Sequence, residues 1–304
     1  MTGAAERRHT LLVGLNFAAV YTLWGSTYLA IRYGVQDLPP ALLAGTRFLI
    51  AGTILFAWLL WRQVPLPPKG MLLPIAVTGT LLLVGGNGLV TYAELTVPSG
   101  MAAVIVANVP FCMVGLEAMR RDGEPITLLV AVGLLVGFGG MLILMWPRML
   151  HFVESGVGDL RGELALLGAI LSWAAGSIYG KHRVRGVAPL MGVALEMLLA
   201  GLLLTLIGLG LGEAPRFHLT PRGMAALAWL VVAGSLFGYS AYIWLLTHVP
   251  AAKVSTYAYV NPVIAVGLGW LFLGEVVDLR MTIGTVVILA GVAAVNLARV
   301  KLRT

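Results

Sequence analysis

The first half of the chain contains the stretch Trp24-Gly25-Ser26-Thr27-Tyr28, which is followed by Pro40 and by Ala51-Gly52. The same pattern returns 149 residues later, without a gap, in the second half of the chain. The returning residues are Trp173, Pro189 and Ala200-Gly201. An internal repeat on this scale governs the interpretation of the whole fold, because each copy is expected to form the same structural unit.

A second set of residues repeats at a spacing of 152 positions. Val97-Pro98 matches Val249-Pro250, and Pro110 matches Pro262. Each half also contains five apolar stretches. An odd number of stretches makes the two halves cross a membrane in opposite directions, and inverted repeats of this kind build many secondary transporters.

The composition places the chain in a membrane. Of its 304 residues, 59% are hydrophobic and only 11% are charged, and the mean hydropathy is +0.94, whereas soluble domains have about 25% charged residues. The charges lie mostly between apolar runs of about 20 residues, the length that crosses a bilayer core. We therefore predict an all-α integral membrane protein of ten transmembrane helices in two inverted five-helix repeats, residues 10–146 and 161–299. The predicted spans are 10–33, 39–61, 70–93, 98–119, 126–146, 161–181, 187–211, 222–246, 251–273 and 279–299.

The net charge of +7 is spread over the loops and does not form one basic patch. If the N-terminus is cytoplasmic, 13 Lys and Arg residues lie on the cytoplasmic side and 6 on the other. This bias, with the even number of spans, predicts that both termini are cytoplasmic. The expected partners are the lipid bilayer and a small-molecule substrate, with no nucleic acid. Two repeats in one chain suit a working monomer and leave a dimer open.

Glycine is abundant in the predicted spans, and the chain contains 38 glycines in all. Small residues let helices approach closely in lipid, where no hydrophobic force drives helices together. We interpret most of the glycines as helix-packing residues. Examples are Gly133, Gly137, Gly140, Gly284 and Gly291.

Several Trp and Tyr residues lie within the spans, although these residue types prefer the membrane–water boundary. Trp173 is the repeat counterpart of Trp24, and both are near mid-span. Buried indole and phenol groups need hydrogen-bond partners, which a solute cavity would supply; ordinary helix packing is the alternative interpretation. The aromatic candidates for substrate binding are Trp24, Tyr28, Trp173, Tyr239, Tyr242 and Tyr257.

Pro110 and Pro262 lie near mid-span at matching repeat positions, beside Asn108 and Asn261 respectively. A proline inside a helix frees a carbonyl group and permits a kink. The neighbouring amide could bond the freed carbonyl or a ligand, so both Asn residues are substrate-binding candidates, as is Asn87 deep in the third span. The two prolines are candidate hinges, because symmetric placement suits a moving part.

Arg47 and Glu196 occupy the same repeat position with opposite charge. Ionisable residues inside a membrane are costly and indicate function. The two should lie toward opposite sides of the membrane, so that each needs its own partner. We predict a gating role for both, and for Arg47 the alternative is a side chain that extends to the membrane surface. Glu94 and Glu163 lie near span ends and are expected to face water.

The sequence lacks the residues that several other classes of membrane protein require. All five histidines lie in tails or loops, no pair of aspartates lies at membrane depth, and no phosphate-binding loop is present. We therefore predict no cofactor, no metal site and no ATP-driven pump. An intramembrane lipid-modifying enzyme is a remote alternative, since no catalytic constellation lies deep in the spans, and a structural or assembly protein is a further one.

Taken together, the motifs resemble the bacterial EamA-type transporters of the drug/metabolite transporter superfamily over essentially the whole chain. The matching residues are Trp24-Gly25-Ser26-Thr27-Tyr28, Pro39-Pro40, Gly45-Thr46-Arg47-Phe48, Trp173-Ala174-Ala175-Gly176-Ser177, Tyr257-Ala258-Tyr259-Val260-Asn261-Pro262 and Leu273-Gly274-Glu275. The resemblance implies a central cavity lined by spans one, three, four, six, eight and nine, and a place in the bacterial inner membrane.

The resemblance also implies a secondary active or facilitative exporter of small metabolites, with amino acids as the first expectation and alternating access as the mechanism. Export of drugs or other amphipathic or cationic compounds is the alternative. The related four-helix multidrug exporters carry an essential glutamate in their first helix. This chain has none in the span 10–33, which argues against proton antiport by that route.

Overall fold

The computed structural model describes residues 3–119, 128–155, 160–249, 254 and 257–301, and all the regular structure in this part is helical. The first half contains α1 (Gly3–Ala18), η1 (Ala19–Leu23), α2 (Trp24–Gly34), α3 (Pro40–Trp61), η2 (Lys69–Met71), α4 (Leu72–Gly79), η3 (Thr80–Gly88), α5 (Leu89–Ala93), α6 (Ser99–Val106), α7 (Val109–Ala118) and α8 (Leu128–Ser155). The second half contains α9 (Arg161–Arg183), α10 (Pro189–Gly210), η4 (Ala214–Arg216), α11 (Pro221–Trp229), η5 (Leu230–Tyr239), α12 (Ser240–His248), α14 (Tyr257–Leu273) and α15 (Leu279–Lys301).

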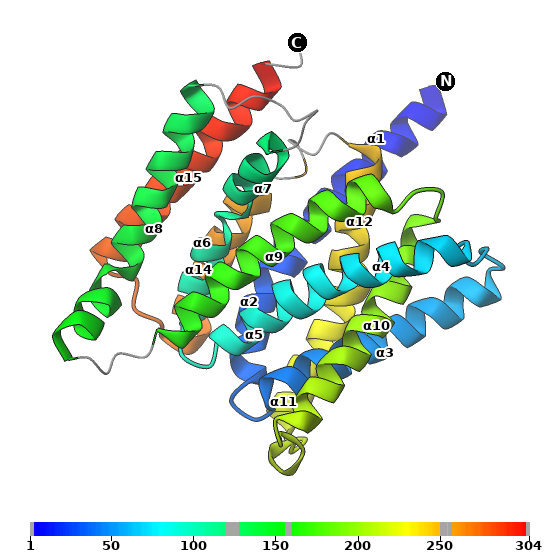
Figure 1. The fold of residues 1–304 in the computed structure, drawn as a ribbon, viewed down its shortest axis with the longest axis horizontal. Coiled ribbons are helices and arrows are strands. Elements are labelled where there is room, and N and C mark those ends of the chain that lie inside the picture. The colour runs from blue at the N-terminus through cyan, green and yellow to red at the C-terminus, as the bar shows by residue number, and fades with distance from the viewer. Residues whose placement is uncertain (1–2, 120–127, 156–159, 250–253, 255–256, 302–304) are drawn as a thin grey trace.

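These elements join end to end into ten membrane spans. Seven helices are long and apolar enough to cross a membrane by length and composition, and two shorter apolar helices, Val260–Leu273 and Leu279–Ala294, add to them. The continuous stretch from α1 to α2 forms the remaining span. The two chain ends lie on the same side of the molecule (Figure 1). We call that side the terminal face, and we call the opposite side, which contains residues 35–39, 94–98, 211–220 and 274–278, the far face.

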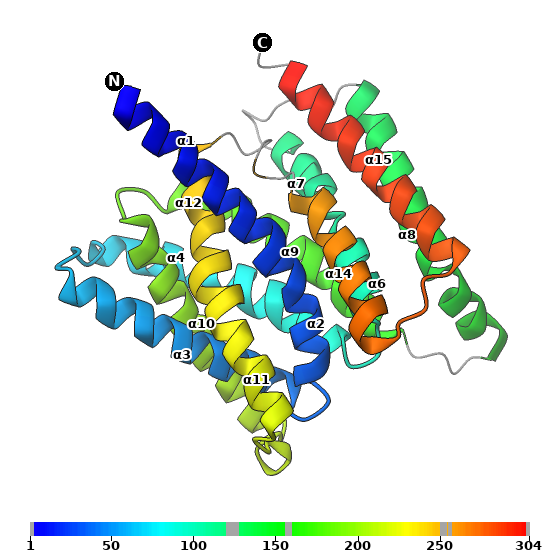
Figure 2. The same ribbon diagram turned by 180° about the vertical axis from the view of Figure 1, so that it is seen from behind.

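Two helix pairs flank the centre of the molecule: α3 runs along α10, and α8 runs along α15 (Figures 1 and 2). Each pair joins the same span of the two halves. Glycines permit the contact between α3 and α10, because a Cβ atom on Gly45 would lie 2.8 Å from the backbone nitrogen of Thr205, and one on Gly201 would lie 2.7 Å from that of Leu49.

The pair of α8 and α15 is built in the same way. A Cβ atom on Gly291 would lie 2.6 Å from the backbone nitrogen of Gly137 and 2.7 Å from the carbonyl oxygen of Gly133, and one on Gly284 would lie 3.2 Å from that of Gly140. The prediction that these five glycines serve helix packing is therefore confirmed. Backbone-to-backbone approach replaces the hydrophobic drive that lipid cannot supply.

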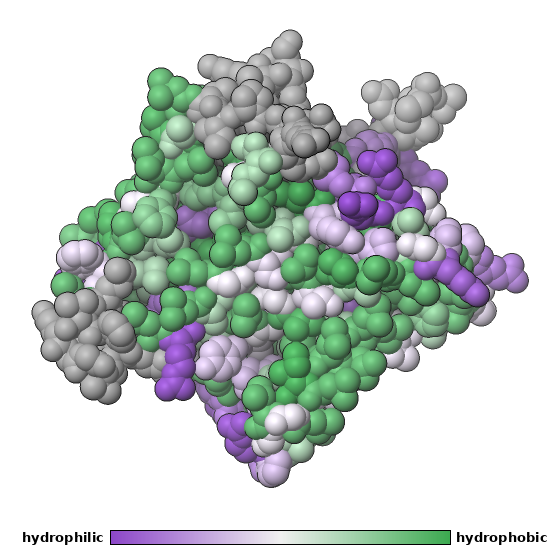
Figure 3. Space-filling model, viewed as in Figure 1, coloured by the Kyte–Doolittle hydropathy of each residue, from purple (hydrophilic) through white to green (hydrophobic). Residues whose placement is uncertain are grey.

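The outside of the bundle is apolar. Figure 3 shows hydrophobic residues over most of one face, with hydrophilic residues gathered toward its edges. Leu128 and Trp61 are 82% and 75% exposed, values that would be unusual for large apolar side chains of a soluble protein. Such a surface suits contact with lipid.

The spans at the centre are irregular. The π-helical segments η1, η3 and η5 interrupt the first, third and eighth spans, and none of them was predicted from the sequence. π-Helical turns are rare and occur often at functional sites. In this protein the three π-helical segments lie in spans that the resemblance to EamA-type transporters assigns to the central cavity.

The two prolines differ. Near Pro110 the fourth span is broken, because α6 ends at Val106 and α7 begins at Val109. The side-chain amide of Asn108 donates to the carbonyl oxygen of Ile105 at 2.9 Å and so satisfies a backbone group at the break. Pro262, in contrast, lies inside the uninterrupted helix α14. The break near Pro110 therefore has no counterpart at Pro262 in the described helix, and the role of both prolines as hinges stays a prediction.

The expectation that Glu94 and Glu163 face water is wrong, because both side chains are 0% exposed. The reason is that neighbouring helices close over these span ends at the far face. The start of α9, for example, packs so tightly that a Cβ atom on Gly162 would lie 2.7 Å from Cγ2 of Val97.

The contact between α8 and α15 generates a matched pair of substitutions. A Cβ atom on Gly140 would lie 2.9 Å from the backbone nitrogen of Ile288, whereas one on the adjacent Gly139 would meet nothing within 4 Å. We expect Gly140→Ala to lower the free energy of unfolding by about 1–3 kcal/mol, the usual cost of overpacking. Gly139→Ala should cause no loss. Thermal unfolding in detergent measures both, and equal behaviour of the two variants would contradict the packing argument.

Candidate functional site

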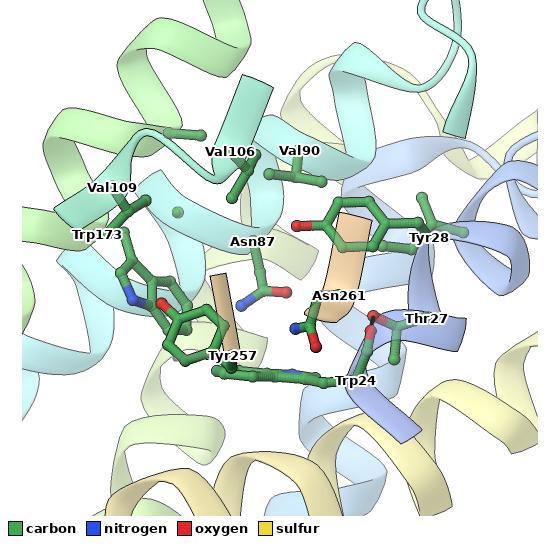
Figure 4. A pocket seen from close by; sticks show the side chains of 13 residues that line it. Trp24, Thr27, Tyr28, Asn87, Val90, Val106, Val109, Trp173, Tyr257 and Asn261 are labelled. Carbon is green, nitrogen blue, oxygen red and sulfur yellow. Dashed lines mark hydrogen bonds between the residues drawn. The ribbon is translucent and has the colours of Figure 1, made fainter. Parts of the chain in front are cut away.

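A central cavity of about 60 Å³ lies between spans from both halves of the chain (Figure 4). Six of the nine residues predicted to bind substrate line it. They are Trp24, Tyr28, Asn87, Trp173, Tyr257 and Asn261. The other lining residues, which the sequence did not single out, are Thr27, Ile31, Gly86, Val90, Val106, Val109 and Ala169. Most of these are small or apolar and carry no pattern that distinguishes a cavity wall from a helix contact.

The remaining three candidates lie behind the wall. Asn108 is 5% exposed and bonds the backbone of its own span. The hydroxyl of Tyr239 donates to Oε2 of Glu196 at 2.5 Å. Tyr242 supports the wall, since its ring centroid lies 5.1 Å from that of Trp24 and 5.8 Å from that of Trp173.

Trp24, Trp173, Tyr242 and Tyr257 form an aromatic cluster that draws on four spans, through α2, α9, α12 and α14. The centroids of Trp24 and Trp173 are 5.4 Å apart, and those of Tyr242 and Tyr257 are 5.7 Å apart in an edge-to-face arrangement. Ring pairs at such distances add about 0.5–1.5 kcal/mol beyond their area burial. Because Tyr242 and Tyr257 lie toward the terminal-face ends of their spans, the cluster separates the cavity from that face.

The polar groups of the cavity are amides, hydroxyls and an indole. Asn87 and Asn261, from different halves, lie near each other in the close-up view (Figure 4). In the orientation that satisfies its hydrogen bonds, the Asn261 amide donates to the carbonyl oxygens of Val20 and Tyr21 in η1. The indole nitrogen of Trp173 is buried beside the hydroxyl groups of Tyr242 and Tyr257. The side chains that line the cavity therefore offer donors and acceptors but no fixed charge.

The cavity is small for a solute site. One water molecule needs roughly 10–15 Å³ on this scale, so about 60 Å³ holds a few waters. Sites for drug-sized ligands occupy about 300–1,000 Å³. A solute could enter only after the surrounding spans move apart.

The two intramembrane charges both bond η5 in the eighth span. Arg47 is 2% exposed, and its Nε donates to Oγ of Ser235 at 2.8 Å, so it does not extend to the membrane surface. Glu196 accepts from Tyr239, four residues farther along the same segment. The prediction that each charge has its own partner is confirmed. Their placement connects the α3–α10 pair to an irregular helix beside the cavity, while a gating role stays a prediction.

The far face is closed by carboxylates. Asp37, after α2, accepts from Nε of Arg222 at 2.8 Å, from Nη2 of Arg222 at 2.5 Å and from Oγ1 of Thr220 at 2.7 Å. These hydrogen bonds from Arg222 and Thr220 to Asp37, which we call the fork at Asp37, join the first span to the eighth. A hydrogen bond from the hydroxyl of Tyr33 to the carbonyl oxygen of Phe272, at 2.9 Å, joins the first span to the ninth.

Two copies of the sequence Leu-Gly-Glu build a further part of this closure. In Leu211-Gly212-Glu213 and Leu273-Gly274-Glu275 the glycine has a φ of 69° and 63°, a conformation that L-residues rarely adopt. Each glutamate then reaches the N-terminus of a helix in the other half. Glu213 accepts from the backbone nitrogen of Leu42 at 2.9 Å, and Glu275 accepts from those of Ser99 and Gly100 at 2.7 and 3.0 Å.

These caps are favourable for two reasons. The first turn of a helix has backbone N–H groups without partners, and its positive dipole end attracts a carboxylate. Both capped helices, α3 and α6, begin beside a proline, at Pro40 and after Pro98. Leu273-Gly274-Glu275 is among the residues that carry the family resemblance, and its copy Leu211-Gly212-Glu213 could have been found from the sequence, whereas the partner helices of both could not.

Comparison with known proteins agrees with this architecture. The model of the EamA-like transporter family matches residues 12–146 and 160–297. The chain therefore belongs to the EamA-like transporter family, and its fold is that of a ten-helix membrane protein with two inverted five-helix repeats.

Individual relatives cover nearly the same range. The chain is 42% identical over 284 residues to the uncharacterized inner membrane transporter YedA of Escherichia coli K12, with 88% of each protein covered. It is 26% identical over 281 residues to the uncharacterized transporter YoaV of Bacillus subtilis, with 92% and 95% covered. A solved crystal structure superimposes with a TM-score of 0.67 at 21% identity and covers 96% of this chain and 98% of its own, which shows the shared fold.

The fork at Asp37 predicts a pH dependence at the far face. Hydrogen bonds from Arg222 and then from Thr220 lower the pKa of Asp37 from 3.8 to about 2. A carboxyl whose folded-state pKa is depressed stabilises the fold above its unfolded value, and that contribution is lost as the pH falls through the folded value. We expect thermal stability to decline between pH 4 and pH 2, and part of this decline to be absent in Asp37→Asn. Arg222→Gln should remove the same part; an unchanged profile in both variants would contradict the assignment.

Proposed function

We propose that this protein exports small metabolites, foremost amino acids, across the bacterial inner membrane by alternating access. The observation that carries the proposal is the central cavity, which is uncharged and is lined by aromatic and amide side chains from both halves of the chain. The name of the YedA relative supports the inner-membrane location. The excess of Lys and Arg on the terminal-face side supports cytoplasmic termini, with the far face directed outward.

The chemistry of the wall suits a zwitterion. A free amino acid has no net charge, so a cavity without fixed charges does not exclude it. The amide nitrogen of Asn87 and the indole nitrogen of Trp173 line the cavity and are donors for a carboxylate. The faces of Trp24 and Tyr257 can accept an ammonium group by cation–π attraction, which is worth about 2 kcal/mol when the cation is desolvated.

The same wall makes a cationic drug the less favoured substrate. A cation without a carboxylate of its own would depend on cation–π attraction alone, because none of the lining side chains carries a negative charge. Aromatic amphipathic solutes stay the second candidate, because three rings of the aromatic cluster, those of Trp24, Trp173 and Tyr257, line the cavity.

Alternating access is supported by the distribution of bonds around the cavity. On one side, charged hydrogen bonds join span ends at the far face. On the other side, the aromatic cluster consists of ring contacts. The spans between them contain π-helical segments and the break at Ala107 and Asn108, where a backbone can rearrange at lower cost than in a regular helix.

Uptake into liposomes tests the proposal. Purified protein should accumulate labelled amino acids saturably, above empty liposomes, and a comparison with and without a pH gradient reports proton coupling. Trp24→Ala should weaken apparent affinity about tenfold, because one aromatic contact and one cation–π contact together are worth about 1–3 kcal/mol. Trp146→Ala is the matched control, since Trp146 is 54% exposed on α8, away from the cavity.

The competing outcomes are distinct. Transport of aromatic cationic dyes in place of amino acids would establish the alternative substrate class. Folded protein that transports neither class would overturn the proposal, and an equal loss in Trp24→Ala and Trp146→Ala would remove the cavity from the mechanism.

A further inference from the structure

One carboxyl group at the far face has no role in the closure described above. Glu94 lies directly after the span that ends at Ala93, and its side chain is 0% exposed. Neither of its carboxyl oxygens has a hydrogen-bond partner. An ionised carboxylate that is buried without donors is strongly disfavoured, whereas the neutral acid costs far less.

The surroundings of Glu94 come from several elements. Tyr28 and Arg32 of α2 and Glu275 after α14 interact with it electrostatically. The start of α9, with Arg161 and Glu163, packs against the end of α5, because a Cβ atom on Gly162 would lie 3.1 Å from the carbonyl oxygen of Ala93. Glu94 is thus placed between a residue of the cavity wall, Tyr28, and a residue of the far-face closure, Glu275.

The nearby cation does not bond the carboxyl group of Glu94. The Nη1 atom of Arg32 donates instead to the main-chain carbonyl oxygens of Glu94 and Leu95, the latter at 3.1 Å. This bond joins the first span to the third at the far face. Arg32 therefore acts as a structural link in the closed conformation.

The nearby anion is firmly held. Glu275 accepts three hydrogen bonds, from the backbone nitrogen and Oγ of Ser99 at 2.7 and 2.8 Å and from the backbone nitrogen of Gly100 at 3.0 Å. Two adjacent carboxylates cannot both ionise easily. Burial, and then the charge of Glu275, raise the pKa of Glu94 well above its usual range, although Arg32 acts in the opposite direction.

We propose that Glu94 is a proton-binding site that controls the far face: the face is closed while Glu94 holds a proton and opens when the proton leaves. The proton would be taken from water at the far face, to form the O–H bond of a carboxylic acid, and returned there. An ionised Glu94 would repel Glu275 and attract the guanidinium of Arg32 away from the two carbonyl oxygens. Both effects weaken contacts that hold α2, α5 and α6 together at this face.

The role of this site in transport rests on the proposed function, whereas proton binding and opening do not. Since Tyr28 is in the cavity wall, a solute in the cavity and a proton on Glu94 would influence each other through one side chain. The sequence places no glutamate in the first span, so this site would give the protein a protonatable group by a different route.

Two measurements without any solute test the inference on the full chain in detergent. Infrared difference spectroscopy between acidic and alkaline pH should show the carbonyl stretch of a buried carboxylic acid that disappears as the pH rises. Spin labels at Leu95 and Val276, which are 41% and 81% exposed, should move apart over the same pH range when Cys112 is replaced by Ser.

Glu94→Gln should lose the infrared band and keep the closed label distance at every pH, because glutamine cannot ionise. Glu94→Asp, the conservative variant, should restore both signals at a shifted pH and so guards against a folding defect. Glu163→Gln is the matched control, since it removes another carboxyl group that is 0% exposed at the far face, and it should keep the pH-dependent distance change.

A pH-dependent opening that persists in Glu94→Gln, or that disappears in Glu163→Gln instead, would overturn the inference. The proposed function can fail separately. If no amino acid is transported but Glu94 controls opening, the proton site stands and the substrate assignment is wrong; if transport is observed and opening ignores pH, the reverse holds.

Discussion

The hydrocarbon core of a bilayer offers no hydrogen-bond partners, so polar groups at membrane depth have to be satisfied inside the protein. This constraint explains the irregular centre of the molecule. Asn108 bonds a carbonyl at the break in the fourth span, and the Asn261 amide bonds two carbonyls of η1. Arg47 and Glu196 turn inward to η5. These groups therefore satisfy backbone and side-chain polar atoms around the cavity. An irregular backbone is tolerated in a membrane protein where it lines such a cavity.

Among the described residues, the contacts on the two sides of the cavity are of different kinds. At the far face, Glu213 and Glu275 of the second half cap helices of the first half, so that charged bonds connect the two repeats. Toward the terminal face the cavity is bounded by the aromatic cluster. Its ring contacts are individually weak and tolerate a range of orientations. The proposed alternating access would exchange one set of contacts for the other without unfolding any helix.

Sequence patterns predicted the candidate site unevenly. The repeat pair Trp24 and Trp173, together with Tyr and Asn residues deep in other spans, led to six residues of the cavity wall, because such side chains at membrane depth need polar partners. Asn108 carries the same signal but serves its own backbone. Glu94 and Glu163 sit near span ends, where hydropathy predicts contact with water, yet the adjacent span ends bury them. Burial of a span end depends on neighbours from distant parts of the chain, and no local pattern reports it.

The sequence by itself determined the class of the protein: apolar length, charge placement and an odd-numbered internal repeat leave little freedom in how the chain can lie in a bilayer. It also marked the glycines of the α8–α15 contact, since only close backbone approach explains so many of them. Only the tertiary structure decided which polar groups face the cavity, that two Leu-Gly-Glu segments cap helices of the other half, and that Glu94 is buried beside Glu275. These features depend on pairing between spans far apart in the chain, and the periodicity of a single helix contains no information about its partner.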